Sequence, residues 1–288
     1  MQLGLSRSER TFRIFALILV GGFSLLAFFP VVYSFSASIS GKIAYETGQV
    51  LIAPVDTTFE VYELIYLDKG LWISFTNTLF YTIFGTAWSL FMTITGAYAL
   101  GKRRLLFRRT FNFLVVFTMW FSAGMVPLFL NYTGLGVDNR WGLIVAFGVQ
   151  AFNIILMRSF FAAIPHEIEE AARIDGANEF QMLVNIFMPM SKAAIATIAL
   201  FYATSRWNGY FWARMLISDP NDLPLQVYMR ILIENFRWMF DDMPPDLPYS
   251  PDSYIFAVLI VSIIPVLIVY PYISRHFAKG VNLGGVKE

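Results

Sequence analysis

The sequence contains no cysteine and only two histidines among its 288 residues. Without cysteine the chain cannot form a disulfide, a thiolate metal site or a cysteine nucleophile. His166 and His276 lie on different predicted loops, and neither belongs to an HExxH-type motif. We therefore expect both histidines at the surface, no metal site and no metal-dependent catalysis.

Charged residues are also scarce. They make up 14% of the sequence, whereas hydrophobic residues make up 57%. This balance lies outside the range of ordinary soluble domains, so the composition predicts a membrane protein surrounded by lipid. The formal net charge is only +1, which gives no excess that would favour nucleic acid as a partner.

Six apolar stretches are long enough to cross the hydrocarbon core of a bilayer. The sequence therefore predicts an all-α polytopic membrane protein, a single transmembrane domain over residues 1–288 with six transmembrane helices. The fifth helix is the least regular, because Arg206 interrupts it. The expected ranges are about 14–36, 72–100, 110–130, 141–162, 193–213 and 253–274.

Lysine and arginine residues predict the orientation, because cytoplasmic loops carry an excess of both. Eleven of them lie in the N-terminal tail, the 101–110 loop and the tail 275–288. These segments alternate correctly for one side of the membrane, so both termini are expected in the cytoplasm. The same alternation places the 163–192 loop in the cytoplasm and an acidic loop, about 207–252, outside.

An energy source is also missing from the sequence. The stretch Gly280–Lys287 lacks the glycine-lysine-serine or glycine-lysine-threonine order of a phosphate-binding loop. Ion-coupled carriers need acidic groups inside the membrane, yet none of the six apolar runs contains Asp or Glu. These absences favour a passive pathway driven from outside the chain. The alternatives are an ion-coupled secondary transporter and a non-transporting membrane scaffold.

The polar insertion of residues 165–189 carries a helical pattern between two apolar segments. Ile168, Ala171 and Ala172 recur at helical spacing, and the glycine turn at Gly176 is predicted to end this first helix. Asn178 is a good N-cap for a second helix, which Pro189 is predicted to interrupt. The apolar residues of that second helix are expected on one face: Phe180, Leu183, Val184 and Phe187. Periodicity alone also fits an amphipathic hairpin that lies on the membrane surface.

This insertion resembles the EAA signature of the membrane subunits of binding-protein-dependent ABC importers. One position departs from the pattern, because Met188 stands where leucine is usual, but the exchange conserves volume and apolarity. The resemblance implies a type I importer permease fold and makes residues 165–189 a coupling hairpin that seats on a cytoplasmic ATPase. The implied coupling residues are Glu170, Ala171, Ala172, Asp175, Gly176, Ile186 and Pro189.

Two further segments resemble carbohydrate-uptake permeases related to the smaller membrane subunit of the maltose transporter. Trp207-Asn208, Asp219-Pro220 and Pro224-Leu225-Gln226 are similar to the outer loop of that subunit, which contacts the loaded binding protein. The C-terminal segment is similar to its tail, which reaches into the ATPase. The implied tail contacts are Gly284, Gly285, Val286 and Lys287.

The resemblance also implies partners, because one such chain supplies half of a translocation pathway for a sugar or oligosaccharide. A second homologous permease, two ATP-binding subunits and an extracytoplasmic solute-binding protein are expected. ATP and Mg²⁺ would be bound by the ATP-binding subunits, so this chain would be a non-catalytic, multi-pass component of the bacterial cytoplasmic (inner) membrane.

Arg206 and its aromatic neighbours are the candidate substrate contacts. A sugar stacks its apolar face on aromatic rings, and its hydroxyl groups need directional hydrogen bonds. The fixed charge of an arginine in the pathway would suit an acidic sugar such as a uronide. The alternative is an aromatic belt at the outer interface with a snorkelling arginine. The candidates are Arg206, Trp207, Asn208, Tyr210 and Phe211.

Overall fold

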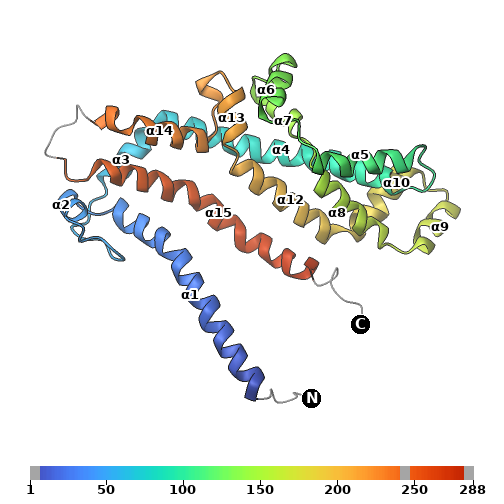
Figure 1. Cartoon of the computed structure of the whole chain (residues 1–288), viewed down its shortest axis with the longest axis horizontal. Coiled ribbons are helices and arrows are strands. Elements are labelled where there is room, and N and C mark those ends of the chain that lie inside the picture. Colours follow the sequence, from blue (N-terminus) through green and yellow to red (C-terminus); the bar gives the residue numbers. More distant parts are fainter. Residues whose placement is uncertain (1–6, 241–246, 282–288) are drawn as a thin grey trace. The chain divides into compact units, whose positions relative to one another are not determined.

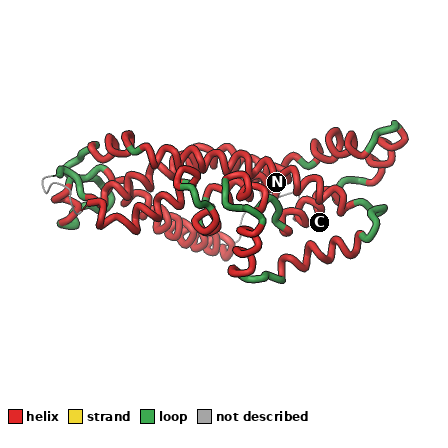
Figure 2. Tube along the Cα trace, turned by 90° about the horizontal axis from the view of Figure 1, so that it is seen from above, coloured by secondary structure: helices red, strands yellow, loops and turns green. Residues whose placement is uncertain are grey.

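The computed structural model describes residues 7–240 and 247–281, and over these residues the chain is helical (Figure 1). The β-type pairing in this part of the chain is an isolated antiparallel bridge between Gly41 and Tyr249. Figure 2 accordingly draws helices joined by short loops. The predicted all-α fold class is confirmed.

The helices form two compact units. The first contains residues up to Lys69 together with Met229–Ile264, and the second contains Gly70–Tyr228 and the residues from Pro265 on. Helices of the first unit are α1 (Arg7–Ser38), α2 (Lys42–Glu46), α3 (Glu60–Leu67), most of α14 (Leu225–Phe240) and the first part of α15 (Pro251–Val281).

Aromatic and polar contacts hold the first unit together. Phe256 of α15 meets the ring of Tyr33 edge-on, with centroids 5.7 Å apart, and the ring of Tyr45 at 5.9 Å. Tyr254 donates a hydrogen bond to Asp68 over 2.6 Å. The start of α15 is therefore fixed to the loops that follow α1 and α3.

Three single helices in the described residues are long and apolar enough to cross a membrane: Ser8–Ser38, Lys69–Gly101 and Pro251–Ile268. Three pairs of helices also pass this test, but each pair is bent by more than 40° at a short break. The count reaches the expected six when each bent pair is one span. The pairs are Arg108–Trp120 with Met125–Gly134 (119°), Arg140–Ala146 with Ala151–Ala162 (52°), and Glu179–Met190 with Lys192–Trp207 (85°).

The prediction of one continuous helix was therefore wrong for three of the six ranges, each of which contains two helices. The expected helix 110–130 is split into α5 (Arg108–Trp120) and α6 (Met125–Gly134). Gly124 before α6 has φ +87°, a left-handed conformation that an α-helix does not contain. The chain therefore turns sharply at this glycine.

The expected helix 141–162 is split into α7 (Arg140–Ala146) and α8 (Ala151–Ala162). A Cβ at Gly148 in the break would lie 2.4 Å from the indole nitrogen of Trp88, so the close approach of this side chain requires glycine. The expected helix 193–213 ends early, at Asn208-Gly209. It is split into α12 (Lys192–Trp207) and α13 (Phe211–Leu216).

The expected outer loop 207–252 also contains more helix than predicted. After α13 come the short 3₁₀ turn η2 (Pro220–Asp222) and the long helix α14 (Leu225–Phe240). Leu225, Met229 and Leu232 recur at helical spacing, which is the signal for α14 in the sequence.

The core of the second unit lies among α4 (Lys69–Gly101), α8 and α12, and α8 also packs against α5 (Figure 1). The hairpin of residues 165–189 contributes its second half to this core and is thereby seated on one end of α4. The buried residues of this core are Ile94, Ala97, Tyr98, Ile154, Met157, Phe161, Met182, Leu183, Phe187, Ala194, Ile198 and Tyr202.

Candidate functional site

The hairpin turns where the sequence predicts. Helix α9 (His166–Ile174) begins directly after Pro165, and Gly176 has φ +82°, which glycine adopts without the steric cost of a side chain. Asn178 caps α10 (Glu179–Met182) through a reciprocal pair of hydrogen bonds with Gln181, each 2.9 Å long. The predicted glycine turn and N-cap are confirmed.

The second half of the hairpin passes through Pro189, so the predicted interruption at this residue is wrong. The π-helical turn η1 (Leu183–Phe187) continues into α11 (Met188–Met190), and the break comes at Ser191. A π-helical turn bonds residues five apart and changes the hydrogen-bond register just before the proline, which has no N–H to donate. The helix therefore accommodates Pro189.

One side of the hairpin is buried and the other carries exposed apolar side chains. Leu183 and Phe187 lie in the core. Phe180 and Val184 were predicted on the same face, but they are exposed, and Phe180 is 73% exposed. Ile174, at the end of α9, is 87% exposed. The hairpin thus presents Ile174 and Phe180 on either side of its glycine turn.

Ion pairs hold the buried side of the hairpin to the end of α4. Lys102 Nζ lies 2.8 Å from Glu169 of α9 and 3.7 Å from Glu179 of α10. Arg104 also contacts the Glu179 carboxylate. Arg173 Nη2 lies 2.7 Å from Glu169 and 3.4 Å from Glu179. We call these five residues the hairpin clamp.

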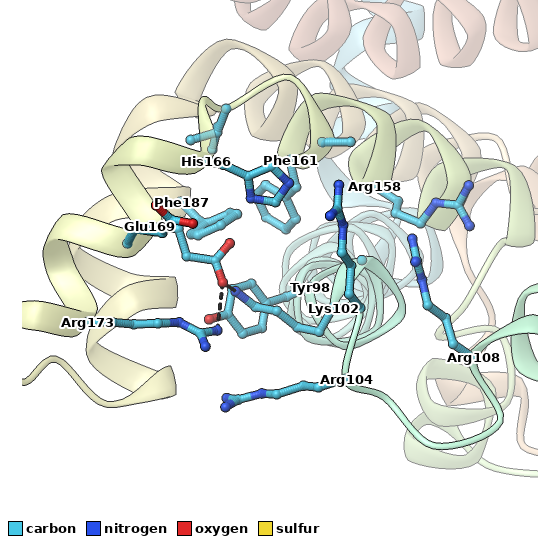
Figure 3. A pocket seen from close by; sticks show the side chains of 15 residues that line it. Tyr98, Lys102, Arg104, Arg108, Arg158, Phe161, His166, Glu169, Arg173 and Phe187 are labelled. Atoms are coloured by element: carbon cyan, nitrogen blue, oxygen red, sulfur yellow. Dashed lines mark hydrogen bonds and ion pairs between the residues drawn. The ribbon is translucent and has the colours of Figure 1, made fainter.

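Aromatic side chains enclose the centre of the hairpin clamp (Figure 3). The Lys102 ammonium lies 4.2 Å from the ring centroid of Tyr98 and 4.6 Å from that of Phe187. The Tyr98 hydroxyl donates a 2.6 Å hydrogen bond to Glu179. The clamp was not predicted, because Lys102 and Arg104 were considered only for orientation and lie 67 and 75 residues from their partners Glu169 and Glu179. The sequence did contain a signal for it: the 101–110 loop is basic, the 163–192 loop carries acidic residues, and both loops are predicted on the same side of the membrane.

The electrostatics of the clamp favour an ionised Glu169. Partial burial would raise the pKa of this carboxyl, but the hydrogen bond and charge of Lys102 and the charge of Arg173 outweigh it. The net result is a pKa below the ordinary value. A carboxyl whose pKa is lowered by folding stabilises the folded arrangement above its ordinary pKa, and this contribution is lost as the pH falls through the lowered value.

We therefore expect the hairpin clamp to hold unchanged from pH 7.5 to pH 5 and to loosen only below the ordinary carboxyl pKa of 4.5. The chain has no cysteine, so spin labels on Ala171→Cys and Thr110→Cys can report the spacing of α9 and α5. Their distance distribution should broaden only in the acidic range. The control is Glu169→Gln, which should give a broad distribution at every pH. Broadening of the native pair between pH 7 and pH 5 would contradict the ion-pair assignment.

The opposite end of α4 is tied to the segment that contains η2. Asn77 donates to the main-chain oxygens of Asn221 and Leu223 over 2.6 and 3.1 Å. The Arg140 guanidinium lies 2.6 Å from the Asp222 carboxylate and donates to Asn77 over 2.8 Å. Polar contacts therefore hold α4 near both of its ends, here to the η2 segment and at the other end to the hairpin. In the sequence, the only sign of the contacts described here is the polar Asn77 within an apolar run.

Arg206 is held at the break between α7 and α8. Its guanidinium donates to the main-chain oxygens of Leu143 and Ile144, each over 3.2 Å, and of Phe147 over 2.6 Å. These are carbonyl groups that the interrupted helix leaves unpaired. Gly85 of α4 makes room for the guanidinium, since a Cβ there would lie 2.9 Å from Nε. The guanidinium points into the protein, so the alternative of a snorkelling arginine is wrong.

Tyr202 supports the other side of the same break. Its hydroxyl accepts a 3.2 Å hydrogen bond from the Gln150 N–H, directly before α8, and lies 2.7 Å from the Thr93 hydroxyl. Tyr202 and Arg206 are one turn apart on α12. This helix therefore satisfies main-chain groups on both sides of the bend, which explains how the bend is tolerated.

The other substrate-pathway candidates do not gather around Arg206. Trp207 is buried with its ring edge-on to Phe75, at 6.2 Å. Asn208 donates to the Thr204 main-chain oxygen of its own helix over 2.9 Å. Tyr210 directly precedes α13, and Phe211 at its start is exposed. Substrate contact by these residues stays a prediction.

The coupling residues named from the resemblance lie together on the hairpin. Ala172, Asp175, Gly176 and Ile186 line one open hollow of about 380 Å³ between its helices. Glu170, Ala171 and Pro189 are exposed but do not line this hollow. The predicted tail contacts Gly284, Gly285, Val286 and Lys287 lie outside the described residues.

Comparisons with known proteins place the chain in a family. Residues 6–283 match the family described as "Binding-protein-dependent transport system inner membrane component". The polygalacturonan/rhamnogalacturonan transport system permease protein YtcP of Bacillus subtilis is 37% identical over 282 residues, which cover 96% of this chain and 99% of that protein. The sn-glycerol-3-phosphate transport system permease protein UgpE of Brucella abortus is 27% identical over 278 residues, with 92% and 93% covered.

A solved structure agrees with these relatives. It is the crystal structure of a bacterial ABC transporter involved in the import of the acidic polysaccharide alginate. The matched chain is 45% identical, superposes with a TM-score of 0.87, and the match covers 96% of this chain and 100% of that one. The chain therefore belongs to the inner-membrane components of binding-protein-dependent transport systems, and within them to the carbohydrate-uptake ABC permeases.

Proposed function

We propose that this chain forms half of the pathway of an ATP-driven importer for acidic oligosaccharides. A second homologous permease completes the pathway, and two ATP-binding subunits, which bind ATP and Mg²⁺, drive it. An extracytoplasmic solute-binding protein delivers the substrate. Both termini and the hairpin lie in the cytoplasm, consistent with the lysine and arginine residues on that side.

The observation that carries the proposal is that the hairpin packs one side into the core and exposes apolar side chains on the other. Ile174 and Phe180 are 87% and 73% exposed at the turn, although burial of each would be worth about 1.5–3 kcal/mol. Exposed apolar side chains beside a hollow indicate a protein partner, and a coupling ATPase fits the place of this segment in the family.

The hairpin clamp supplies the rigidity that a coupling element needs. Glu169 and Glu179 tie both hairpin helices to the end of α4 through Lys102, and the side chains of Leu183 and Phe187 are buried in the same core. A movement that an ATPase imposes on the hairpin would therefore pass to α4, instead of being lost in a flexible loop.

The acidic substrate class is supported by the relatives and not by a cavity in this chain. The named substrates include polygalacturonan and rhamnogalacturonan for one relative and an acidic polysaccharide for another. Both polygalacturonan and alginate are polymers of uronic acids. We infer a uronate-containing oligosaccharide for this permease.

The test is transport by the complete complex in proteoliposomes with its binding protein. We expect ATP-dependent uptake of galacturonate oligosaccharides at least about ten-fold faster than uptake of neutral glucose oligosaccharides of equal length, a difference of about 1.4 kcal/mol. Uptake of neutral sugars alone would contradict the acidic class. Absence of ATP-dependent uptake of any sugar by an assembled complex would contradict the permease role.

A further inference from the structure

We propose that a basic cavity beside the hairpin binds the phosphate group of an anionic phospholipid headgroup. The cavity has a volume of about 580 Å³ and lies among the end of α4, the start of α5, the end of α8 and α9 (Figure 3). Glu169 and Glu170 are its acidic lining residues. The basic ones are Lys102, Arg103, Arg104, Arg108, Arg158 and Arg173, with His166 beside them. The lining thus carries a clear surplus of positive charge.

The arginines of the cavity differ in their partners. Arg104 and Arg173 belong to the hairpin clamp and share carboxylates. Arg108 and Arg158 are half-buried, and in the described part of the chain no carboxylate lies within 4.0 Å of either. Their charges are partly shielded from water without a counter-charge from the described residues, and an anion in the cavity would supply one.

Neutral hydrogen bonds hold these two arginines in place and leave donors available. Arg108 Nε donates to the Leu100 main-chain oxygen over 3.3 Å, and Arg158 Nη1 donates to the side-chain oxygen of Asn112. Asn112 in turn donates to the Arg108 main-chain oxygen over 2.8 Å. Each guanidinium has five N–H groups, so these bonds orient the two side chains and still leave N–H groups for a ligand.

Phosphate suits this arrangement because its several oxygens can accept from both guanidinium groups at once. Guanidinium groups bind phosphate oxygens in pairs, and Arg108, held by the Leu100 oxygen, and Arg158, held by Asn112, line the same cavity, so that one phosphate there can meet both. Arg108 is also the first residue of α5, whose N-cap Phe107 offers no capping side chain. The positive end of this 13-residue helix adds to the attraction for an anion.

The surroundings favour a lipid over a free phosphate ion. Leu106 and Phe107, directly before Arg108, are 74% and 71% exposed, and Phe111 and Leu114 on α5 are exposed after it. Apolar side chains next to arginines at the end of a membrane helix suit the boundary between acyl chains and headgroups. Basic pockets between membrane helices on the cytoplasmic side, where the positive charges of this chain place the cavity, are typical sites for acidic headgroups.

The inference concerns binding and does not depend on the proposed transport function. Because α9 forms one wall of the cavity, a bound headgroup would lie between the hairpin and the start of α5. We therefore expect anionic lipid to restrict the movement of the hairpin, in addition to the hairpin clamp.

The experiment is native mass spectrometry of the full chain, purified in detergent and supplied with phosphatidylglycerol or phosphatidylcholine. We expect at least about ten-fold preferential retention of phosphatidylglycerol, and its loss in the double variant Arg108→Gln/Arg158→Gln. The matched control is Arg109→Gln, since Arg109 is exposed and does not line the cavity; it should retain the lipid. Arg158→Lys keeps the charge without paired donors and should retain part of the binding.

Three results would overturn the proposal. Undiminished retention by the double variant would exclude the cavity, and equal loss in Arg109→Gln would show only general charge attraction. Displacement of the lipid by an excess of inorganic phosphate would assign the site to a free anion instead of a headgroup. Thermal melting of each variant without lipid separates loss of binding from loss of folding, and Arg158→Lys serves as the test if the double variant does not fold.

Discussion

Replacement of Arg206 by methionine is expected to reduce the amount of folded permease strongly and to abolish transport of every substrate. The guanidinium donates to three main-chain oxygens at the bend between α7 and α8, and methionine can donate to none. Each buried polar group left without a partner costs about 1–3 kcal/mol. Loss of three such bonds would therefore lower the ratio of folded to unfolded chain by roughly two orders of magnitude or more. The measurement is the yield and melting temperature of the complex.

The control for this variant is Arg214→Met. Arg214 is an exposed arginine on α13, so its replacement removes a charge without leaving carbonyl groups unpaired inside the protein. We expect a normal yield and melting temperature for it. A stable Arg206→Met complex with normal melting would contradict the bracing role.

Arg206→Gln separates bracing from the substrate contact that the sequence predicts. If the guanidinium neutralises an acidic sugar, uptake of galacturonate oligosaccharides should fall while melting and neutral uptake, where present, stay unchanged. If it braces the bend, both kinds of uptake should fall together with the melting temperature. Unchanged uptake of charged and neutral substrates alike would remove the substrate-contact hypothesis.

The parts of the structure that the sequence predicted are those that local residues determine. The turn at Gly176 and the cap at Asn178 depend on conformational preferences of residues a few positions apart. The outline of the apolar segments depends only on their composition and length. Neither feature depends on residues distant in the sequence, so both could be predicted.

The parts that were missed depend on residues distant in the sequence. The bend at Gly148 accommodates Trp88 of α4, and Arg206 braces it from 59 to 63 residues away. Periodicity within 141–162 gives no sign of either. The hairpin clamp joins Lys102 to Glu169 over 67 positions for the same reason.

Helix geometry explains why the predicted sugar contacts do not gather. Arg206 and Trp207 are neighbours in sequence, but successive residues of an α-helix point about 100° apart. Arg206 therefore reaches the bend between α7 and α8, whereas Trp207 meets Phe75. A cluster of suitable residue types in sequence is not a cluster in space when it lies on a helix.

Gly176→Val should abolish ATP-driven transport while the chain still inserts and assembles in the membrane. Gly176 has φ +82°, and nothing lies within 4 Å of the position of a Cβ, so the cost of valine is conformational and not a collision. About 2 kcal/mol of backbone strain corresponds to a roughly 30-fold bias against the native turn. A changed turn would redirect α9 against α10 and separate Ile174 from Phe180, the pair proposed to meet the ATPase. The measurements are co-purification with the ATP-binding subunits and binding-protein-stimulated ATP hydrolysis.

Gly136→Val is the matched control, because Gly136 has φ +70° and also has nothing within 4 Å of a Cβ position. It places the same strain in the turn between α6 and α7, outside the hairpin, and we expect near-normal coupling. Gly176→Asn should restore much of the activity, since asparagine tolerates the left-handed conformation better than valine. Equal defects in Gly176→Val and Gly136→Val would mean that strain acts through general stability, and normal ATP hydrolysis in Gly176→Val would contradict the coupling role. A selective defect at Gly176 that asparagine relieves would tie transport to the geometry of this one turn.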